Sequence, residues 1–192
     1  MLDQNKIAGR HLVLDTWGYR TYSHCFFPIS CFLFTFAPHK YEMEQLNLPP
    51  FNVRLKQTDG RDQIFDVLRR RYVALTPEEW VRQHFVHYLL EQKGYPKGLL
   101  ANEIELRIGE KKMRCDSVLY DNQLHPRIII EYKAPHIALS QRVFDQISVY
   151  NMLLHVDYLV VSNGLQHYCC KMNYAQKRYT FLRAIPDYES LV

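Results

Sequence analysis

The alternation of apolar and polar positions predicts an ordered domain from residue 43 onward. Two runs rich in Ile, Val and Tyr, at 114–120 (RCDSVLY) and 127–133 (RIIIEYK), flank the turn-like segment 121–126 (DNQLHP). Such runs bounded by turn residues predict two neighbouring antiparallel strands. Residues 100–108 alternate strictly, which predicts a third strand that enters the pair through a turn at Gly109-Glu110.

Helical spacing predicts elements on both sides of these strands. In the stretch 76–93, Thr76 and Glu79 form a Thr-x-x-Glu capping pattern around Pro77, and Gly94 follows as a stop. A second helix is predicted over 139–155, with apolar positions suited to packing on a sheet: Leu139, Val143, Ile147 and Leu154.

Three further segments complete the expected order. Residues 62–73 predict a short helix with Ile64, Phe65 and Leu68 as its apolar stripe, after an extended lead-in at 46–56. The continuous apolar run 158–162 predicts a strand buried on both faces, followed by weaker strands near 166–171 and 178–182. The pattern α-β-β-β-α-β predicts an α/β domain with a mixed β-sheet flanked by helices.

Composition narrows the function classes. The 192 residues are 47% hydrophobic and 23% charged, as in a soluble globular domain, and the net charge of +4 permits nucleic-acid binding without requiring it. The five cysteines show no CxxC spacing, which favours reduced thiols in a cytoplasmic protein over disulfides or zinc. No Walker-type motif is present, so nothing indicates an ATP-driven motor.

Residues 1–42 differ from the rest. The apolar run 25–37 contains Pro28 and is shorter than the roughly 20 residues of a membrane helix, and it starts late for a signal peptide. We expect 1–42 to be a poorly structured extension upstream of the true start at Met43, and 43–192 to be the functional domain, with no membrane association. Intact-mass measurement of the native protein tests this, and a mass beginning at Met1 would contradict it.

The predicted hairpin places charged residues together. Folding it about the midpoint between Gln123 and Leu124 puts Asp116 opposite Glu131, and Lys133 shares their face. Opposed carboxylates repel each other, unless a divalent cation lies between them. A two-residue turn at 109–110 would add Glu103 opposite Asp116, although a bulge would shift that register.

Phosphodiester hydrolysis assisted by Mg²⁺ suits this set. Asp116 and Glu131 would bind the metal together with the backbone carbonyl of Tyr132, and Lys133 would orient or deprotonate the attacking water or stabilise the transition state. Deprotonation by lysine requires a lowered pKa. From spacing alone, an ordinary surface aspartate and an exposed Glu131–Lys133 salt bridge remain the alternative.

Further motifs add a family resemblance. Asp116, the run 131–135 (EYKAP), and Gln146 with Tyr150 four positions later are joined by 75–85 (LTPEEWVRQHF), 158–168 (YLVVSNGLQHY) and 185–188 (IPDY). Over about residues 50–188 the sequence resembles the PD-(D/E)XK nuclease superfamily, and specifically the N-terminal nuclease domain of type I restriction enzyme R subunits.

This resemblance implies a restriction-endonuclease-like core and an endodeoxyribonuclease that depends on Mg²⁺, or on Mn²⁺ in its place. It implies Asp116, Glu131 and Lys133 as the catalytic set, and Gln146 and Tyr150 as residues that support DNA positioning or cleavage. The implied partners are DNA and restriction-modification subunits encoded elsewhere, one of which would read the target sequence.

The sequence also departs from the family pattern. Cys115 stands where a proline usually precedes the first acidic residue. The helicase-like translocase of R subunits is absent, so we expect no cleavage coupled to translocation by this polypeptide alone. Two alternatives therefore remain: a catalytically silent DNA-binding module, and an interaction subunit marked by a large apolar patch.

Two smaller features have ordinary interpretations. The run Arg69-Arg70-Arg71 is either a phosphate contact or, at least as well supported, a solvated charged face. His84 and His87 lack a third metal ligand, so we interpret them as ordinary helix residues.

Overall fold

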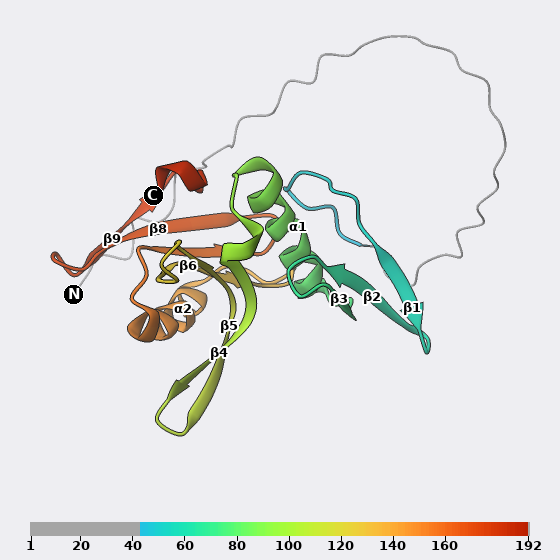
Figure 1. The fold of residues 1–192 in the computed structure, drawn as a ribbon, viewed down its shortest axis with the longest axis horizontal. Helices are drawn as coiled ribbons and strands as arrows, with labels where there is room; N and C mark the ends of the chain where they lie inside the picture. The colour runs from blue at the N-terminus through green and yellow to red at the C-terminus, as the bar shows by residue number, and fades with distance from the viewer. Residues whose placement is uncertain (1–42, 192) are drawn as a thin grey trace, which may run out of the picture. The chain divides into compact units, whose positions relative to one another are not determined.

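The computed structural model describes residues 43–191, so the expectations for residues 1–42 lie outside the described part of the chain. Its centre is a six-stranded sheet in the order β4-β5-β6-β7-β8-β9 (Figure 1). The strands are β4 (Leu100–Ile108), β5 (Lys111–Tyr120), β6 (Pro126–Tyr132), β7 (Tyr158–Ser162), β8 (His167–Asn173) and β9 (Arg178–Leu182). Only β6 and β7 pair in parallel among these, which confirms the predicted mixed sheet.

Two α-helices in the described chain pack on this sheet. The α1 helix (Pro77–Gln92) begins at Thr76, whose side chain accepts a hydrogen bond from the Glu79 backbone N–H at 3.0 Å, as the capping pattern predicts. The α2 helix (Gln141–Leu154) is the crossover between the parallel strands β6 and β7. Short 3₁₀ helices lie at η1 (Lys97–Leu99) and η2 (Tyr188–Ser190).

The core has two layers, one under each helix. Alternate residues of β6 point to opposite faces of the sheet. Ile128 and Ile130 pack in the cluster that contains α1 residues, whereas Ile129 packs in the cluster that contains Val143 and Ile147 of α2. Every residue of β7 is buried, as its continuous apolar run predicts. The sheet is therefore enclosed at its centre, where β6 lies.

Both predicted hairpin registers are confirmed. In β5–β6 the pairs Ser117↔Ile130 and Val118↔Ile129 follow the predicted midpoint, and a bulge occurs only near the turn, after Leu119. In β4–β5 the pair Ile108↔Lys111 encloses a two-residue turn at Gly109-Glu110. Extending these registers places position 116 opposite both 131 and 103.

The helix predicted over 62–73 is wrong. This segment forms two strands of a separate sheet, in the order β1 (Leu55–Thr58), β2 (Arg61–Asp66), β3 (Arg71–Ala74). Asp59 and Gly60 both have positive φ, at 50° and 72°, as a tight hairpin turn requires. Asp66 ends β2 by accepting hydrogen bonds from the backbone N–H groups of Leu68 and Arg69, each at 2.8 Å. These turn signals outweigh the apparent helical spacing.

Among the described helices, none has the length and apolar character needed to cross a membrane.

Candidate active site

Glu131 lies near the end of β6 and is almost fully buried, with 2% exposure. Its Oε1 accepts hydrogen bonds from Lys133 Nζ at 2.7 Å and from Gln146 Nε2 at 2.5 Å. Its Oε2 is buried without a hydrogen-bond partner among residues 43–191. A buried carboxylate oxygen without a donor is costly, because the water it loses is not replaced.

Asp116, on β5, is buried beside this strand with 8% exposure. Its Oδ2 accepts a hydrogen bond from the Tyr132 backbone N–H at 2.8 Å, which fixes the carboxylate against β6. Its Oδ1 accepts one from Arg82 Nη2, also at 2.8 Å. Asp116 and Glu131 therefore meet at the β5–β6 pairing, as the hairpin register predicts.

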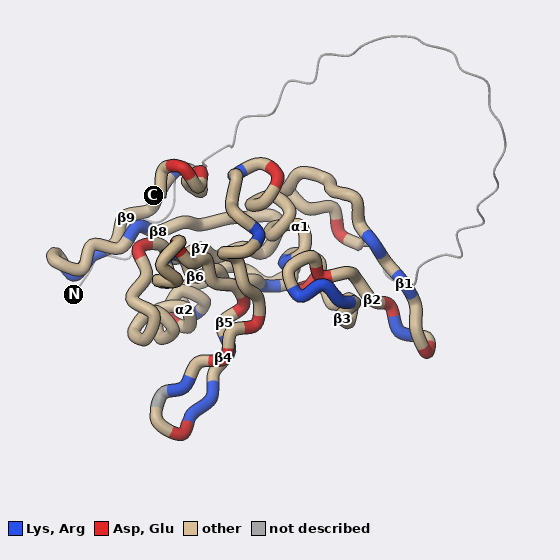
Figure 2. Tube along the Cα trace, in the orientation of Figure 1, with Lys and Arg blue, Asp and Glu red and all other residues tan. Residues whose placement is uncertain are grey.

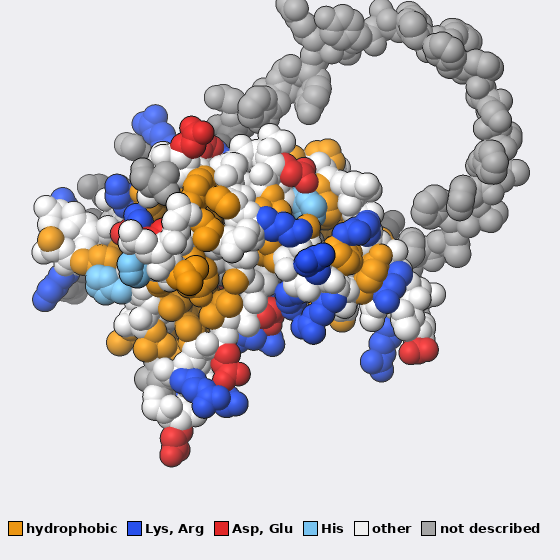
Figure 3. All heavy atoms as spheres, in the orientation of Figure 1, with side chains coloured by type: hydrophobic (Ala, Val, Ile, Leu, Met, Phe, Trp, Pro, Cys, Tyr) orange, Lys and Arg blue, Asp and Glu red, His pale blue; other side chains and the backbone are white. Residues whose placement is uncertain are grey.

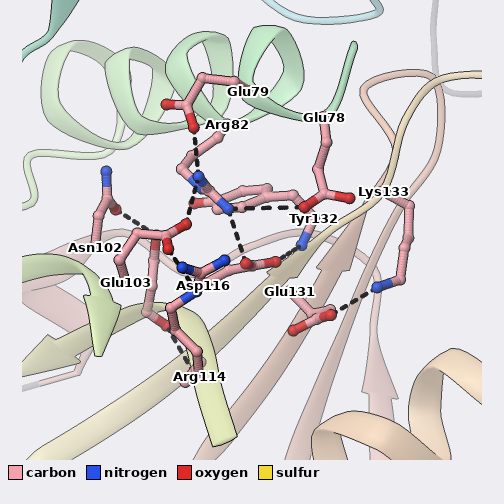
Figure 4. A network of polar contacts seen from close by, with 12 residues as sticks. Glu78, Glu79, Arg82, Asn102, Glu103, Arg114, Asp116, Glu131, Tyr132 and Lys133 are labelled. Atoms are coloured by element: carbon pink, nitrogen blue, oxygen red, sulfur yellow. Dashed lines mark hydrogen bonds and ion pairs between the residues drawn. The ribbon is translucent and has the colours of Figure 1, made fainter. Parts of the chain in front are cut away.

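Arg82, on α1, is the residue that sequence reasoning missed. It is 4% exposed and pairs with three carboxylates within 3 Å, from Glu79, Glu103 and Asp116, as Figure 4 shows. These negative charges outweigh the effect of burial and raise the pKa of its guanidinium. In the sequence, Glu79 and Arg82 look like an ordinary surface pair three positions apart. Their burial arises only because α1 packs on the sheet, which brings Arg82 to Glu103 of β4 and Asp116 of β5.

Glu103 joins this group of charged residues through Arg82, which also pairs with Asp116. Its carboxylate bonds Arg82 Nη1 at 2.8 Å and Arg114 Nε at 2.6 Å. Its φ of 60° is unusual within a strand, and it interrupts the ladder between the pairs of Asn102 and Ile104. The β4–β5 register runs past Glu103 without pairing it to Asp116, and cationic side chains bind the Glu103 carboxylate instead.

Gln146 and Tyr150 of α2 join the site from the opposite helix. Gln146 Nε2 donates to Glu131 and to the Tyr150 hydroxyl at 3.1 Å, and Gln146 Oε1 accepts from Lys133 Nζ at 3.3 Å. The helix spacing of four predicts that the pair shares a face. The structure adds that this face contacts Glu131 and Lys133.

Burial, and then the charge of Asp116, raise the pKa of Glu131 to about 7. Glu78, at the first turn of α1, also has a raised pKa, again because of burial and then Asp116. Its Oε1 lies 3.8 Å from Arg82 Nη2. An excess of carboxylate charge therefore accumulates around Asp116, which a further cation would relieve.

Lys133 has the opposite balance. Burial by itself would lower its pKa, but the hydrogen bond to Glu131 and the charges of Glu131 and Asp116 raise it. A lysine with a raised pKa stays protonated, so this geometry disfavours water deprotonation by Lys133. It favours the other predicted role, in which the ammonium stabilises developing negative charge.

The donor set fits a hard divalent cation. Carboxylate oxygens are the ligands that Mg²⁺ prefers, and Glu131 Oε2 is an unsatisfied one beside Asp116. In the arrangement present, however, Arg82 neutralises Asp116. Within residues 43–191, no three His, Cys, Asp or Glu side chains converge closely enough to hold a metal ion. A bound cation would therefore displace the Arg82 guanidinium from Asp116.

The histidines of α1 are structural, as expected. His84 Nδ1 contacts the Trp80 carbonyl at 2.9 Å, and the His87 ring stacks on Phe51. Arg69 is also structural, because it pairs with Asp66 and Glu79, so it is not available to phosphates.

Comparison with known proteins identifies the family of the chain. A fragment structure of a protein assigned as the HsdR subunit of a type I restriction enzyme from Vibrio vulnificus YJ016 is similar, with 17% identity and a TM-score of 0.45. That similarity covers 61% of this chain and 24% of the other. No curated protein matches. The family profile described as type I restriction enzyme R protein N terminus (HSDR_N) matches residues 77–186, more than half of the chain. The chain therefore belongs to the family of type I restriction enzyme R protein N termini.

Proposed function

We propose that this chain is a metal-dependent endodeoxyribonuclease that hydrolyses DNA phosphodiester bonds at the carboxylates of Asp116 and Glu131. One observation carries the proposal: a buried, unsatisfied glutamate oxygen stands beside a second buried carboxylate at the end of the central strand. A glutamate whose pKa is raised by burial and by a neighbouring carboxylate, and which has an unsatisfied oxygen, is typical of a functional site.

Asp116, Glu131 and the backbone carbonyl of Tyr132 would hold Mg²⁺, or Mn²⁺ in its place, and Glu103 is a further ligand candidate. The ion would supply polarisation of the phosphoryl oxygens and activation of water. Lys133 would place its ammonium charge against the phosphoryl group. Gln146 bonds both Lys133 and Glu131, so it would keep these side chains aligned, with Tyr150 supporting it.

Family membership supports DNA as the substrate. We propose that restriction-modification subunits encoded elsewhere are its protein partners. In this arrangement the partner selects the target sequence, and the present domain supplies the hydrolytic site.

The test is plasmid nicking by the full chain with Mg²⁺, with Mn²⁺ and with EDTA. Glu131→Gln and Lys133→Ala are compared with matched surface variants, Glu105→Gln and Lys171→Ala, whose positions are exposed. We expect metal-dependent nicking that falls by at least about a hundredfold in the two site variants, the order of effect seen when a charge-stabilising group is removed. The surface variants should nick like the wild type.

Nicking that survives in both site variants would point to a contaminant and remove the site assignment. Absence of nicking together with salt-sensitive DNA binding would support the silent DNA-binding module. Absence of both would support the interaction subunit.

The silent module has one specific observation in its favour. Arg82 already provides Asp116 with a cationic partner at 2.8 Å. An arginine in that position can take the structural place of a metal ion, because it balances the charge of the Asp116 carboxylate and supplies no catalytic chemistry. Mg²⁺ titration of the wild type, followed by thermal unfolding, separates the two cases, because only a metal-binding site is stabilised by the ion.

A further inference from the structure

The sheet β1-β2-β3 lies outside the region matched by the family, and one of its faces is basic. The pairs Lys56↔Gln63, Thr58↔Arg61 and Phe65↔Tyr72 place their members on a common face, since side chains alternate along each strand. Arg54 joins this face, because its carbonyl accepts the Phe65 backbone N–H at 3.0 Å. We call Arg54, Lys56 and Arg61, with Phe65 and Tyr72 beneath them, the basic face.

The three cations of the basic face are exposed and form no ion pair with any residue from 43 to 191. The carboxylates of β2 point to the other face of the sheet. Asp62 is bonded there to Gln57, and Asp66 is buried. Uncompensated charge therefore accumulates on one side of this sheet. Figure 2 shows where Lys and Arg residues occur along β1.

Aromatic rings hold two of these cations over the sheet. The Arg54 guanidinium carbon lies 3.5 Å from the centroid of the Phe65 ring, and Lys56 Nζ lies 4.5 Å from that of Tyr72. The two rings contact each other edge to face. Such contacts restrict the long side chains, so less conformational entropy is lost when a ligand binds them.

The same contacts indicate which ligand fits. Stacking of unpaired bases requires exposed aromatic faces. Here the rings are half-buried and covered by cations. The basic face therefore presents positive charge rather than π surface, which suits the phosphates of a duplex better than the bases of a single strand.

Buried polar bonds fix this sheet to the candidate active site. Asp66 accepts a hydrogen bond from Asn102 Nδ2 at 3.0 Å, and Asn102 Oδ1 accepts one from Ser117 Oγ at 2.6 Å, next to Asp116. Arg69 links the same turn to Glu79, which pairs with Arg82. In Figure 3, Lys and Arg side chains gather over the β1–β3 part of the molecule.

We propose that the basic face binds the phosphodiester backbone of duplex DNA and holds the duplex on the domain that carries the carboxylates. The proposal rests on the proposed function for the choice of DNA as the ligand. It extends that function by assigning the DNA-holding surface to β1 and β2, outside the matched residues.

The test measures binding of a short fluorescent duplex to the full chain by anisotropy, in EDTA, at several salt concentrations. The variant Arg54→Gln/Lys56→Gln/Arg61→Gln is compared with Lys171→Gln/Arg178→Gln/Arg183→Gln, which removes the same charges from exposed positions on β8, β9 and the segment after it. We expect the basic-face variant to bind about tenfold or more weakly at low salt, with a log–log salt slope smaller by about 2–3. The control should bind almost like the wild type.

Arg61→Glu alone is a second variant, in case removal of the Phe65 and Tyr72 contacts unfolds the sheet. It should weaken binding while leaving thermal unfolding unchanged. Equal binding by the basic-face variant and the wild type, or equal losses in the basic-face and control variants, would overturn the proposal. The proposal would also be overturned if the basic-face variant lost binding to phosphatidylserine vesicles but bound the duplex like the wild type. That result would indicate a membrane ligand.

Because EDTA prevents metal-dependent cleavage, the two proposals fail separately. A wild type that nicks no DNA but binds duplex through the basic face would retain this inference and contradict the nuclease. If the wild type nicks DNA and the basic-face variant binds and nicks DNA equally well, the nuclease proposal is retained and this inference is contradicted.

Discussion

At the candidate site, the carboxylates of Asp116 and Glu131 differ in how completely their oxygens are bonded. Glu131 and Asp116 are both buried, and both oxygens of Asp116 accept a hydrogen bond, from Arg82 and from the Tyr132 backbone N–H. Glu131 shares one oxygen with Lys133 and leaves the other unsatisfied. The fold thus holds one carboxylate in a state that is unfavourable without an additional positive charge.

This imbalance predicts an unusual pH dependence in EDTA. The pKa of Glu131 is about 7 in the folded chain, against 4.5 for an ordinary glutamate. The unfolded chain therefore releases this proton first, and the free energy of unfolding should fall by up to about 3 kcal/mol as pH rises from about 4.5 to about 8. Glu131→Gln removes the titrating group, so its stability relative to the wild type should rise over that range.

Urea denaturation at several pH values measures this effect, with Glu105→Gln as the control. Glu105 is on the surface of β4, with a side-chain exposure of 55%, so its substitution should leave the wild-type profile unchanged. Parallel profiles for Glu131→Gln and the wild type would contradict a buried, strained carboxylate.

At the residue scale, the sequence predicted contacts within one hairpin or one helix, and it missed a contact between elements that are far apart in the chain. Asp116, Glu131 and Lys133 are brought together by one hairpin, and Gln146 with Tyr150 by one helix, so local periodicity was enough. Arg82 reaches Asp116 across 34 positions of sequence. Nothing in the pattern of α1 distinguishes a buried arginine there from a solvated one.

Elements were predicted best where their ends carry chemical signals. The α1 helix has its capping threonine and following glycine, and β7 has an unbroken apolar run, and both were placed within about a residue. The segment 62–73 was misassigned because Ile64 and Phe65 were placed on one helical face. In the hairpin they point to opposite faces, and Asp59-Gly60 was the available signal.

Asp66 is the element-scale contact that joins the three-stranded sheet to the core. Burial would raise its pKa, but hydrogen bonds from the Arg69 backbone, from Asn102 and from the Arg69 guanidinium lower it overall. Asp66→Asn replaces one carboxylate oxygen with an amide NH₂ group, so that a hydrogen-bond donor faces these donors. We expect it to lower the free energy of unfolding by about 2–4 kcal/mol at neutral pH.

The sign of the pH dependence follows from the lowered pKa. The stabilisation by Asp66 is present above its unfolded value of 3.8 and is lost as pH falls through the folded value. The difference between variant and wild type should therefore shrink in acid, as measured by urea denaturation at about pH 7 and about pH 3. Asp62→Asn is the control, since the Asp62 side chain bonds only the exposed Gln57 in the described chain. An equal loss in both variants would refute the special role of Asp66.

At the scale of the whole molecule, an ion bound between two strands should stabilise the folded state. At about ten times its dissociation constant, Mg²⁺ should add about 1.4 kcal/mol to the free energy of unfolding of the wild type. Glu131→Gln should gain much less, because it lacks the unsatisfied carboxylate oxygen. Thermal unfolding with Mg²⁺ and with EDTA measures both, and equal gains would place the ion elsewhere.

The position of β6 has a consequence for how the site can adapt. This strand lies between β5 and β7, with a packed helix layer on each face. Its amide hydrogens should exchange with solvent only through global unfolding, which makes it the most slowly exchanging segment of the chain. Glu131 is therefore fixed in space on every shorter timescale. In the metal-dependent function proposed above, the adjustment to a bound ion would fall to the Arg82 side chain, as a rotamer change rather than a movement of the backbone.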